Sequence, residues 1–230
     1  MSIKKIIAIG SAKGGVGKST ITAALAVSLS KSHKVGVLDA DVYGPNQHLL
    51  FDISGKPQFI KKDDVKFLKP YIKNNIQIIS MGLILDSEKA AAWRGPMLSG
   101  AVKQLINSTL WSDLDFLLID MPPGTGDAYL TIFNEMTIDN FILVTTPSNL
   151  ALADTKKTIN LIEKFKISIL GYIENNISGL KDNINDELFV NKNISNIGVF
   201  QFSEQMANFN IKNQIVDADK IIKKLINDEC

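Results

Sequence analysis

A run of glycines, lysines and hydroxyl side chains near the start of the chain lies between two apolar segments. Residues 6–9 are apolar and β-rich in character, and residues 21–26 have the composition of a helix. Glycines between such elements let several backbone N–H groups point inward, and the N-terminus of a helix adds partial positive charge. The pattern predicts a phosphate-binding loop made of Lys13, Gly14, Gly15, Val16, Gly17, Lys18, Ser19 and Thr20.

Two side chains of this loop have the chemistry that a bound nucleotide needs. We expect Lys18 to reach the outer phosphates and the Ser19 hydroxyl to bind Mg²⁺. The strict pattern begins with glycine, whereas this chain has Ala12 at that position. A methyl group is tolerated there if the backbone φ is negative.

Paired carboxylates follow the second apolar segment of the chain, in Leu38-Asp39-Ala40-Asp41. Two carboxylates at the end of one strand can face the same side, and beside a phosphate loop they can serve a metal ion and a water. We assign Asp41 to orienting the attacking water and Asp39 to hydrogen bonding on the Mg²⁺ side. The same spacing is also common in an ordinary capped turn, and its place after a strand favours the functional interpretation.

A third acidic residue, Asp120, follows the strongly apolar segment 116–119 and has the position of a Walker B acid near the metal. The metal-binding candidates are therefore Ser19, Asp39 and Asp120. Residues 122–126, Pro-Pro-Gly-Thr-Gly, suit a loop that responds to the γ-phosphate.

Asn175 follows a further apolar segment, and its amide could read the edge of a purine base; a role in a turn or cap is equally consistent with its type. The Asn-Lys-x-Asp pattern typical of guanine binding is absent, which favours ATP over GTP.

Apolar, β-branched segments alternate with helical patterns along the chain. The expected strands are Lys4–Ile9, Lys34–Leu38, Ile76–Ser80, Phe116–Ile119, Phe141–Thr145, Ser168–Ile173 and Ile197–Phe200. The expected helices lie near Ser19–Ser30, Gly100–Thr109, Ala128–Glu135, Ala151–Phe165 and Asp217–Asn227. This alternation predicts an α/β fold with a doubly wound, mostly parallel sheet and helices on both faces, the P-loop NTPase fold, with ligands at the carboxyl ends of the strands.

The composition is that of an ordinary globular protein, and we expect one domain over residues 1–230 with a mobile surface segment at 178–196. The net charge of +1 gives no electrostatic case for binding nucleic acid or an anionic membrane. Cys230, the one cysteine, permits no disulfide within the chain. With no room for a signal peptide and no apolar run long enough to span a bilayer, the sequence favours a cytoplasmic protein.

Taken together, these motifs resemble the Mrp/ApbC family of iron–sulfur cluster carriers, in the MinD/ParA-like class with a deviant Walker A loop. The resemblance rests on residues 38–45, 119–127, Trp93-Arg94-Gly95-Pro96-Met97, 144–147 and 151–154, which occur in family order. It implies an ATPase, slow in turnover, that works as a homodimer with Mg²⁺, and iron–sulfur assembly or client proteins as partners. It also implies that Lys13 reaches across the dimer to the partner's nucleotide, as an arginine finger does.

The chain departs from the family pattern in one respect. The family bridges its cluster with a Cys-x-x-Cys pair after the segment around Asn175, whereas this sequence has Cys230 alone. Thiolates are the usual ligands of such clusters. Two functions therefore stay open: an ATP-hydrolysing switch in iron–sulfur cluster assembly or transfer, and a nucleotide-dependent switch that binds a protein partner and carries no cluster.

Overall fold

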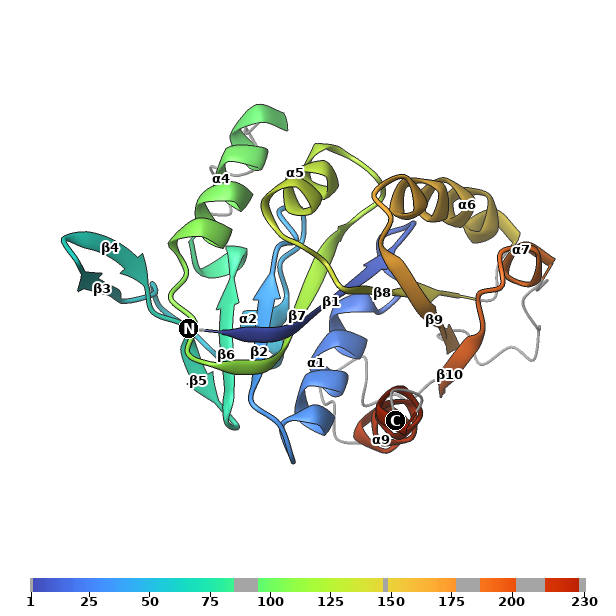
Figure 1. Ribbon diagram of the computed structural model, residues 1–230, viewed down its shortest axis with the longest axis horizontal. Helices are drawn as coiled ribbons and strands as arrows, with labels where there is room; N and C mark the ends of the chain where they lie inside the picture. The colour runs from blue at the N-terminus through green and yellow to red at the C-terminus, as the bar shows by residue number, and fades with distance from the viewer. Residues whose placement is uncertain (1, 85–94, 147–148, 177–186, 202–213, 228–230) are drawn as a thin grey trace.

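The computed structural model describes residues 2–84, 95–146, 149–176, 187–201 and 214–227. Its main feature is an eight-stranded sheet in the order β10-β9-β8-β1-β7-β2-β6-β5 (Figure 1). Neighbouring strands are parallel throughout, except that β5 runs antiparallel to β6 at the edge of the sheet. The predicted α/β architecture with a mostly parallel sheet is confirmed.

All seven strands expected from the sequence belong to this sheet, most of them one or more residues longer than predicted. Their bounds are Ile3–Ser11 (β1), Val35–Asp39 (β2), Ile76–Ser80 (β6), Leu114–Pro123 (β7), Asn140–Thr145 (β8), Ser168–Asn176 (β9) and Asn196–Gln201 (β10). The central strands are nearly continuous runs of buried apolar residues, as expected for a parallel sheet covered on both faces.

Helices cover both faces of the sheet, and each face has its own apolar core. One face packs against α4 (Gly95–Ser108), α5 (Asp127–Glu135), α6 (Asn149–Lys164) and the short α7 (Glu187–Asn191). The other face packs against α1 (Lys18–Leu29), α2 (Gln47–Leu50) and α9 (Gln214–Asn227). Figure 1 shows these two layers on opposite sides of the sheet. The five helices predicted from the sequence are all present.

Several short elements were not predicted from the sequence. The strands β3 (Phe59–Lys62) and β4 (Val65–Leu68) form a separate antiparallel hairpin, which projects beyond the edge of the main sheet in Figure 1. The edge strand β5 (Tyr71–Lys73) joins β6 through a two-residue turn, and a 3₁₀ turn covers Met81–Leu83. Both hairpin turns contain two consecutive residues with positive φ, the conformation that matches the twist of the flanking strands.

The segment 178–196 differs in its second half from the mobile surface segment that the sequence predicts. Residues 178–186 lie outside the described part of the chain, but Glu187–Asn191 form helix α7 and Asn196 begins β10. Phe189 is 1% exposed, and its ring stacks on that of Tyr172 with 3.9 Å between centroids. The polar composition of the segment gave no indication of this buried aromatic side chain, which packs α7 against the sheet.

None of the helices in the described ranges is both long and apolar enough to cross a membrane.

Candidate nucleotide-binding site

The glycine-rich loop joins β1 to α1 at the carboxyl edge of the central strands. Gly15 and Gly17 have φ values of 77° and 81°, a region that side-chain-bearing residues rarely adopt. Gly17 caps α1, whose first residue is Lys18. Ala12 is not among the residues with positive φ, so its methyl group is tolerated as the sequence analysis required. The loop therefore has the backbone form of a phosphate cradle at a helix N-terminus.

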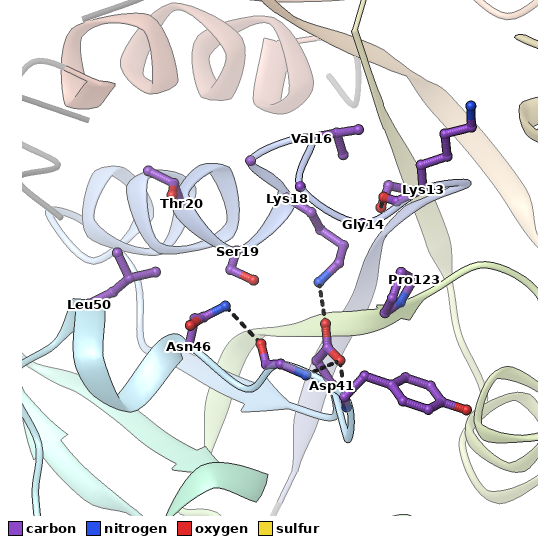
Figure 2. A pocket seen from close by; sticks show the side chains of 15 residues that line it. Lys13, Gly14, Val16, Lys18, Ser19, Thr20, Asp41, Asn46, Leu50 and Pro123 are labelled. Atoms are coloured by element: carbon purple, nitrogen blue, oxygen red, sulfur yellow. Dashed lines mark hydrogen bonds and ion pairs between the residues drawn. The ribbon is translucent and has the colours of Figure 1, made fainter. Parts of the chain in front are cut away.

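A cavity of about 420 Å³ opens over this loop (Figure 2). It is lined by the whole loop from Lys13 to Thr20 and by residues of three other segments: Ser11, Asp41, Tyr43, Gly44, Asn46, Leu50 and Pro123. A Cβ atom added at Gly14 or Gly15 would meet no atom within 4 Å, so the space above these glycines is open to a ligand. The loop is thus exposed to a cavity rather than packed against protein.

Lys18 is the buried cation of the site. Its side chain is 6% exposed; Nζ hydrogen-bonds Asp120 Oδ1 and lies 3.5 Å from Asp41 Oδ2. Burial acts to lower the pKa of Lys18, but the charges of Asp120, Asp41 and Asp39, with the hydrogen bond to Asp120, outweigh it and raise that pKa above its usual value. The lysine is held as a cation, the form that binds phosphate.

Asp41 lies at the wall of the cavity with one carboxylate oxygen fixed. Its Oδ1 accepts hydrogen bonds from the backbone N–H groups of Tyr43 and Gly44, both at 3.0 Å. Its Oδ2 faces Lys18. The fixed carboxylate beside the lysine is suited to hold a water near a phosphate, the role predicted for Asp41, and that role stays a prediction.

Asp39 and Asp120 are direct neighbours in the register of β2 and β7, and Ser80 is opposite Asp39 on β6. Both carboxylates are fully buried. Asp39 accepts from Ser80 Oγ at 2.7 Å, from Gln47 N at 3.0 Å and from Asp41 N at 3.2 Å. Burial and the adjacent charge of Asp120 raise the pKa of Asp39 to about 7, against those hydrogen bonds.

Asp39 is held by donors from Ser80, Gln47 and Asp41, and neither Asp39 nor Asp120 lines the cavity. The role of Asp39 on the Mg²⁺ side stays a prediction. Asp120 differs, because one of its oxygens is held by Lys18, the residue expected to move onto phosphate.

The chemistry of the site fits Mg²⁺ better than an all-protein metal cage. Within the described ranges, no group of three or more His, Cys, Asp or Glu side chains could hold a metal ion. Mg²⁺ commonly uses one or two protein oxygens, with phosphate oxygens and waters completing its shell. The Ser19 hydroxyl at the cavity wall and the Asp120 carboxylate behind Lys18 have oxygen atoms of the type that Mg²⁺ uses, and their role as its ligands stays a prediction.

Asn175, near the C-terminal end of β9, contacts the glycine-rich loop and not the cavity above it. Its side chain is fully buried, does not line the cavity, and donates from Nδ2 to the carbonyl of Val16 at 2.8 Å. Its Oδ1 has no hydrogen-bond partner among the described residues. In this arrangement the amide supports the phosphate loop, and contact with a purine base would require the amide or the loop to move.

Lys13 extends from the loop away from Lys18 and Asp41 (Figure 2). Its Nζ lies 3.8 Å from Asp154 Oδ2, and the lysine side chain is 33% exposed. Trp93, Arg94, Pro147 and Cys230, which contributed to the sequence analysis, lie outside the described residues. Gln47, at the start of α2, contacts Asp39, Asp120 and Ser19, and its residue type gave no signal in the sequence.

The chain is similar to curated proteins named iron-sulfur cluster carrier protein. It is 42% identical over 207 residues to the one from Rickettsia conorii, covering 90% of this chain and 64% of that protein. It is 44% identical over 175 residues to the one from Pseudomonas fragi, covering 76% of this chain and 61% of that protein. The chain thus spans less than two-thirds of the length of these relatives.

Solved structures show the same fold. A nucleotide-binding protein from Archaeoglobus fulgidus in complex with ADP is 30% identical with a TM-score of 0.73, over 95% of this chain and 88% of that one. The septum site-determining protein MinD from Pyrococcus horikoshii, complexed with Mg-ADP, has a TM-score of 0.73 at 24% identity, over 96% and 95%. The ParA model described as NUBPL iron-transfer P-loop NTPase matches residues 2–227. The chain therefore belongs to the family of NUBPL-type iron-transfer P-loop NTPases.

Proposed function

We propose that this chain binds and hydrolyses ATP and acts as a dimeric nucleotide switch in iron–sulfur cluster assembly or transfer. The observation that carries the proposal is the open glycine cradle with a buried, charged Lys18 between two carboxylates. The names of the curated relatives and the ADP complex of the Archaeoglobus protein support it. The proposal places the chain in the cytoplasm, which supplies ATP and keeps thiols reduced.

Hydrolysis proceeds by direct attack of water on the γ-phosphorus. The new bond joins phosphorus to the water oxygen, the bond to the β,γ-bridging oxygen breaks, and ADP and inorganic phosphate leave. Asp41 orients the water, and Lys18 leaves Asp120 to neutralise charge on the phosphate oxygens. Ser19 and Asp120 would hold Mg²⁺, which would supply further neutralisation of the phosphates.

Lys13 acts on the nucleotide of a second copy of the chain. Within one chain Lys13 points away from Lys18 and Asp41 and lies 3.8 Å from Asp154, and this arrangement supports a role outside its own cradle. We expect Lys13→Ala to lower turnover by about 10³-fold, the lower end of the effect of a catalytic cation supplied in trans. ADP affinity should change little, because Lys18 and the loop amides are retained.

The test of this proposal measures phosphate release and ADP binding with the same protein samples. Wild type should release phosphate from ATP. Lys13→Ala should bind ADP normally but should release no appreciable phosphate from ATP. Lys103→Ala, which alters an exposed lysine on α4, should match wild type in both measurements. Normal release by Lys13→Ala would refute the trans-lysine role. Absence of nucleotide binding by the wild type would refute the whole proposal.

The second candidate is a nucleotide-dependent switch that binds a protein partner and carries no cluster. The observation that favours it is the cysteine content, since the 230 residues contain one thiol, at Cys230. Anaerobic reconstitution with iron and sulfide separates the two candidates. A visible thiolate-to-iron absorbance band that follows the protein through gel filtration supports a cluster carrier. Intact phosphate release with no such band supports the partner-binding switch.

A further inference from the structure

The side chain of Gln47 connects three elements of the nucleotide site. It is fully buried at the start of α2, and its Nε2 donates to the carbonyl oxygen of Ser19 at 2.9 Å and to Asp120 Oδ2 at 2.7 Å. Its backbone N–H donates to Asp39 Oδ2 at 3.0 Å. One residue thereby joins α1, β2 and β7, which are distant in the sequence.

The orientation of this amide is determined by its neighbours. The Ser19 carbonyl and the Asp120 carboxylate can only accept hydrogen bonds, so the nitrogen must face them. The amide oxygen, Oε1, then has no partner in the described part of the chain although it is buried. A buried acceptor without a donor costs about 1–3 kcal/mol, which gives this site a reason to admit a donor.

Asp120 is held from both sides by Lys18 and Gln47. Its Oδ1 is held by Lys18 and its Oδ2 by Gln47, so both oxygens are engaged. When Lys18 moves onto phosphate, Oδ1 is released while the bond from Gln47 to Oδ2 can remain. The carboxylate then offers one oxygen to a metal in a fixed orientation. Hydrogen bonds of this kind to metal ligands typically change metal affinity by about 10–100-fold.

We propose, on the basis of the nucleotide-binding function above, that Gln47 is the positioning residue of the magnesium site. It orients Asp120 through Oδ2, ties that carboxylate to the backbone of Ser19, and offers Oε1 to a water that enters with nucleotide and metal. It also fixes the end of the loop that contains Asp41, because the segment 40–46 runs between the Asp39 carboxylate and the Gln47 N–H. The metal site and the water-orienting carboxylate are therefore placed relative to each other by one amide.

The experiment measures Mn²⁺ binding in the presence of ADP from the loss of the free-ion signal in electron paramagnetic resonance, relative to the same Mn²⁺ and ADP concentrations without protein. Gln47→Met keeps a straight side chain of similar length and removes the two hydrogen bonds that Nε2 donates to Ser19 and Asp120. We expect Mn²⁺ affinity to fall about 10-fold or more, and ADP affinity measured with chelator to stay within about 2-fold of wild type, because the loop still holds the phosphates. Gln47→Ala, which leaves room for water, is the second variant if the first does not fold.

Two controls separate positioning from a general structural role. Gln77→Met alters a glutamine on β6 whose Oε1 accepts from Ser112 N, and it should leave Mn²⁺ affinity unchanged. In an Asp120→Asn background, Gln47→Met should add less than about a 2-fold loss, since its effect passes through Asp120. Full additivity of the two changes, unchanged Mn²⁺ affinity in Gln47→Met, or equal loss of metal-free ADP binding would each overturn the proposal. Failure of the wild type to bind ADP would instead refute the proposed function.

Discussion

The carboxyl edge of the central strands (the nucleotide edge), where Lys18 and Asp120 lie, and the β3–β4 hairpin each contain a lysine–aspartate pair, one buried and the other exposed to water. At the nucleotide edge, Lys18 and Asp120 are 6% and 0% exposed. In the hairpin, Lys61 Nζ lies 2.6 Å from Asp64 Oδ1, but these side chains are 64% and 93% exposed. Both pairs are in contact, and they differ in how much water each charge has lost.

This difference in exposure determines how much the loss of one partner changes the free energy of unfolding. A buried pair loses hydration worth several kcal/mol per ion, and attraction between the partners compensates only while both are present. An exposed pair contributes about 0–1 kcal/mol and can be lost with little effect. The proposed function gives a reason for the cost of burying the pair at the nucleotide edge, namely a cation kept ready for phosphate, while the hairpin pair needs no functional explanation.

The largest expected effect comes from Lys18→Met, which leaves Asp39, Asp41 and Asp120 without their cation. We expect the free energy of unfolding to fall by about 3 kcal/mol, because the remaining carboxyls must be buried unpaired or take up protons. ADP binding should be lost in the same variant. Urea denaturation and calorimetric titration measure the two effects, and unchanged stability would break the comparison between the two regions.

The pH dependence of stability tests the burial of Asp39 at the nucleotide edge. The pKa of Asp39 is raised from 3.8 to about 7 in the folded chain, so the folded state binds more protons than the unfolded state between these values. Its contribution therefore lowers stability as pH rises from about 4 to about 7. Asp39→Asn should make the fall in Tm between about pH 5 and about pH 7.5 smaller than in wild type. An unchanged slope would show that Asp39 does not take up this proton.

Left-handed backbone gives a smaller test, because both regions use it with different residue types. Gly15 has a φ of 77° in the loop, and Asp64 has a φ of 63° in the hairpin turn. We expect Gly15→Ala to cost about 1 kcal/mol and to weaken ADP binding, whereas Asp64→Gly should stabilise the chain by less than about 1 kcal/mol. Thermal denaturation of both variants measures this; a stabilising Gly15→Ala would contradict the strained loop.

The smallest effect is expected at the exposed hairpin pair. Lys61→Ala should change the free energy of unfolding by less than about 0.5 kcal/mol and leave phosphate release unaltered. Chemical denaturation beside the Lys18→Met variant provides the direct contrast. A loss comparable to that of Lys18→Met would show that exposure does not separate the two regions.

Long, buried strands were predicted from the sequence, whereas the short, exposed ones were not. Strands β6 and β8 were found within one residue of their observed bounds, because their apolar runs record burial on both faces. The hairpin β3–β4 was missed because its strands are largely exposed and show no clear alternation. A usable signal existed for β5, since Asn74-Asn75 is a pair of residue types that tolerates the two positive φ values of its turn.

The glycine-rich loop, the two acidic strand ends and the alternation of strands and helices could be predicted from the sequence, because they depend on residue types that are adjacent or regularly spaced. Only the tertiary structure decided that Gln47 contacts Asp120, 73 residues away, and that Asn175 supports Val16, 159 residues away. An amide side chain is compatible with surface, turn and core alike. Its role depends on which acceptors the packed strands bring within hydrogen-bond distance. The residue type and its neighbours in the sequence do not specify those distant acceptors.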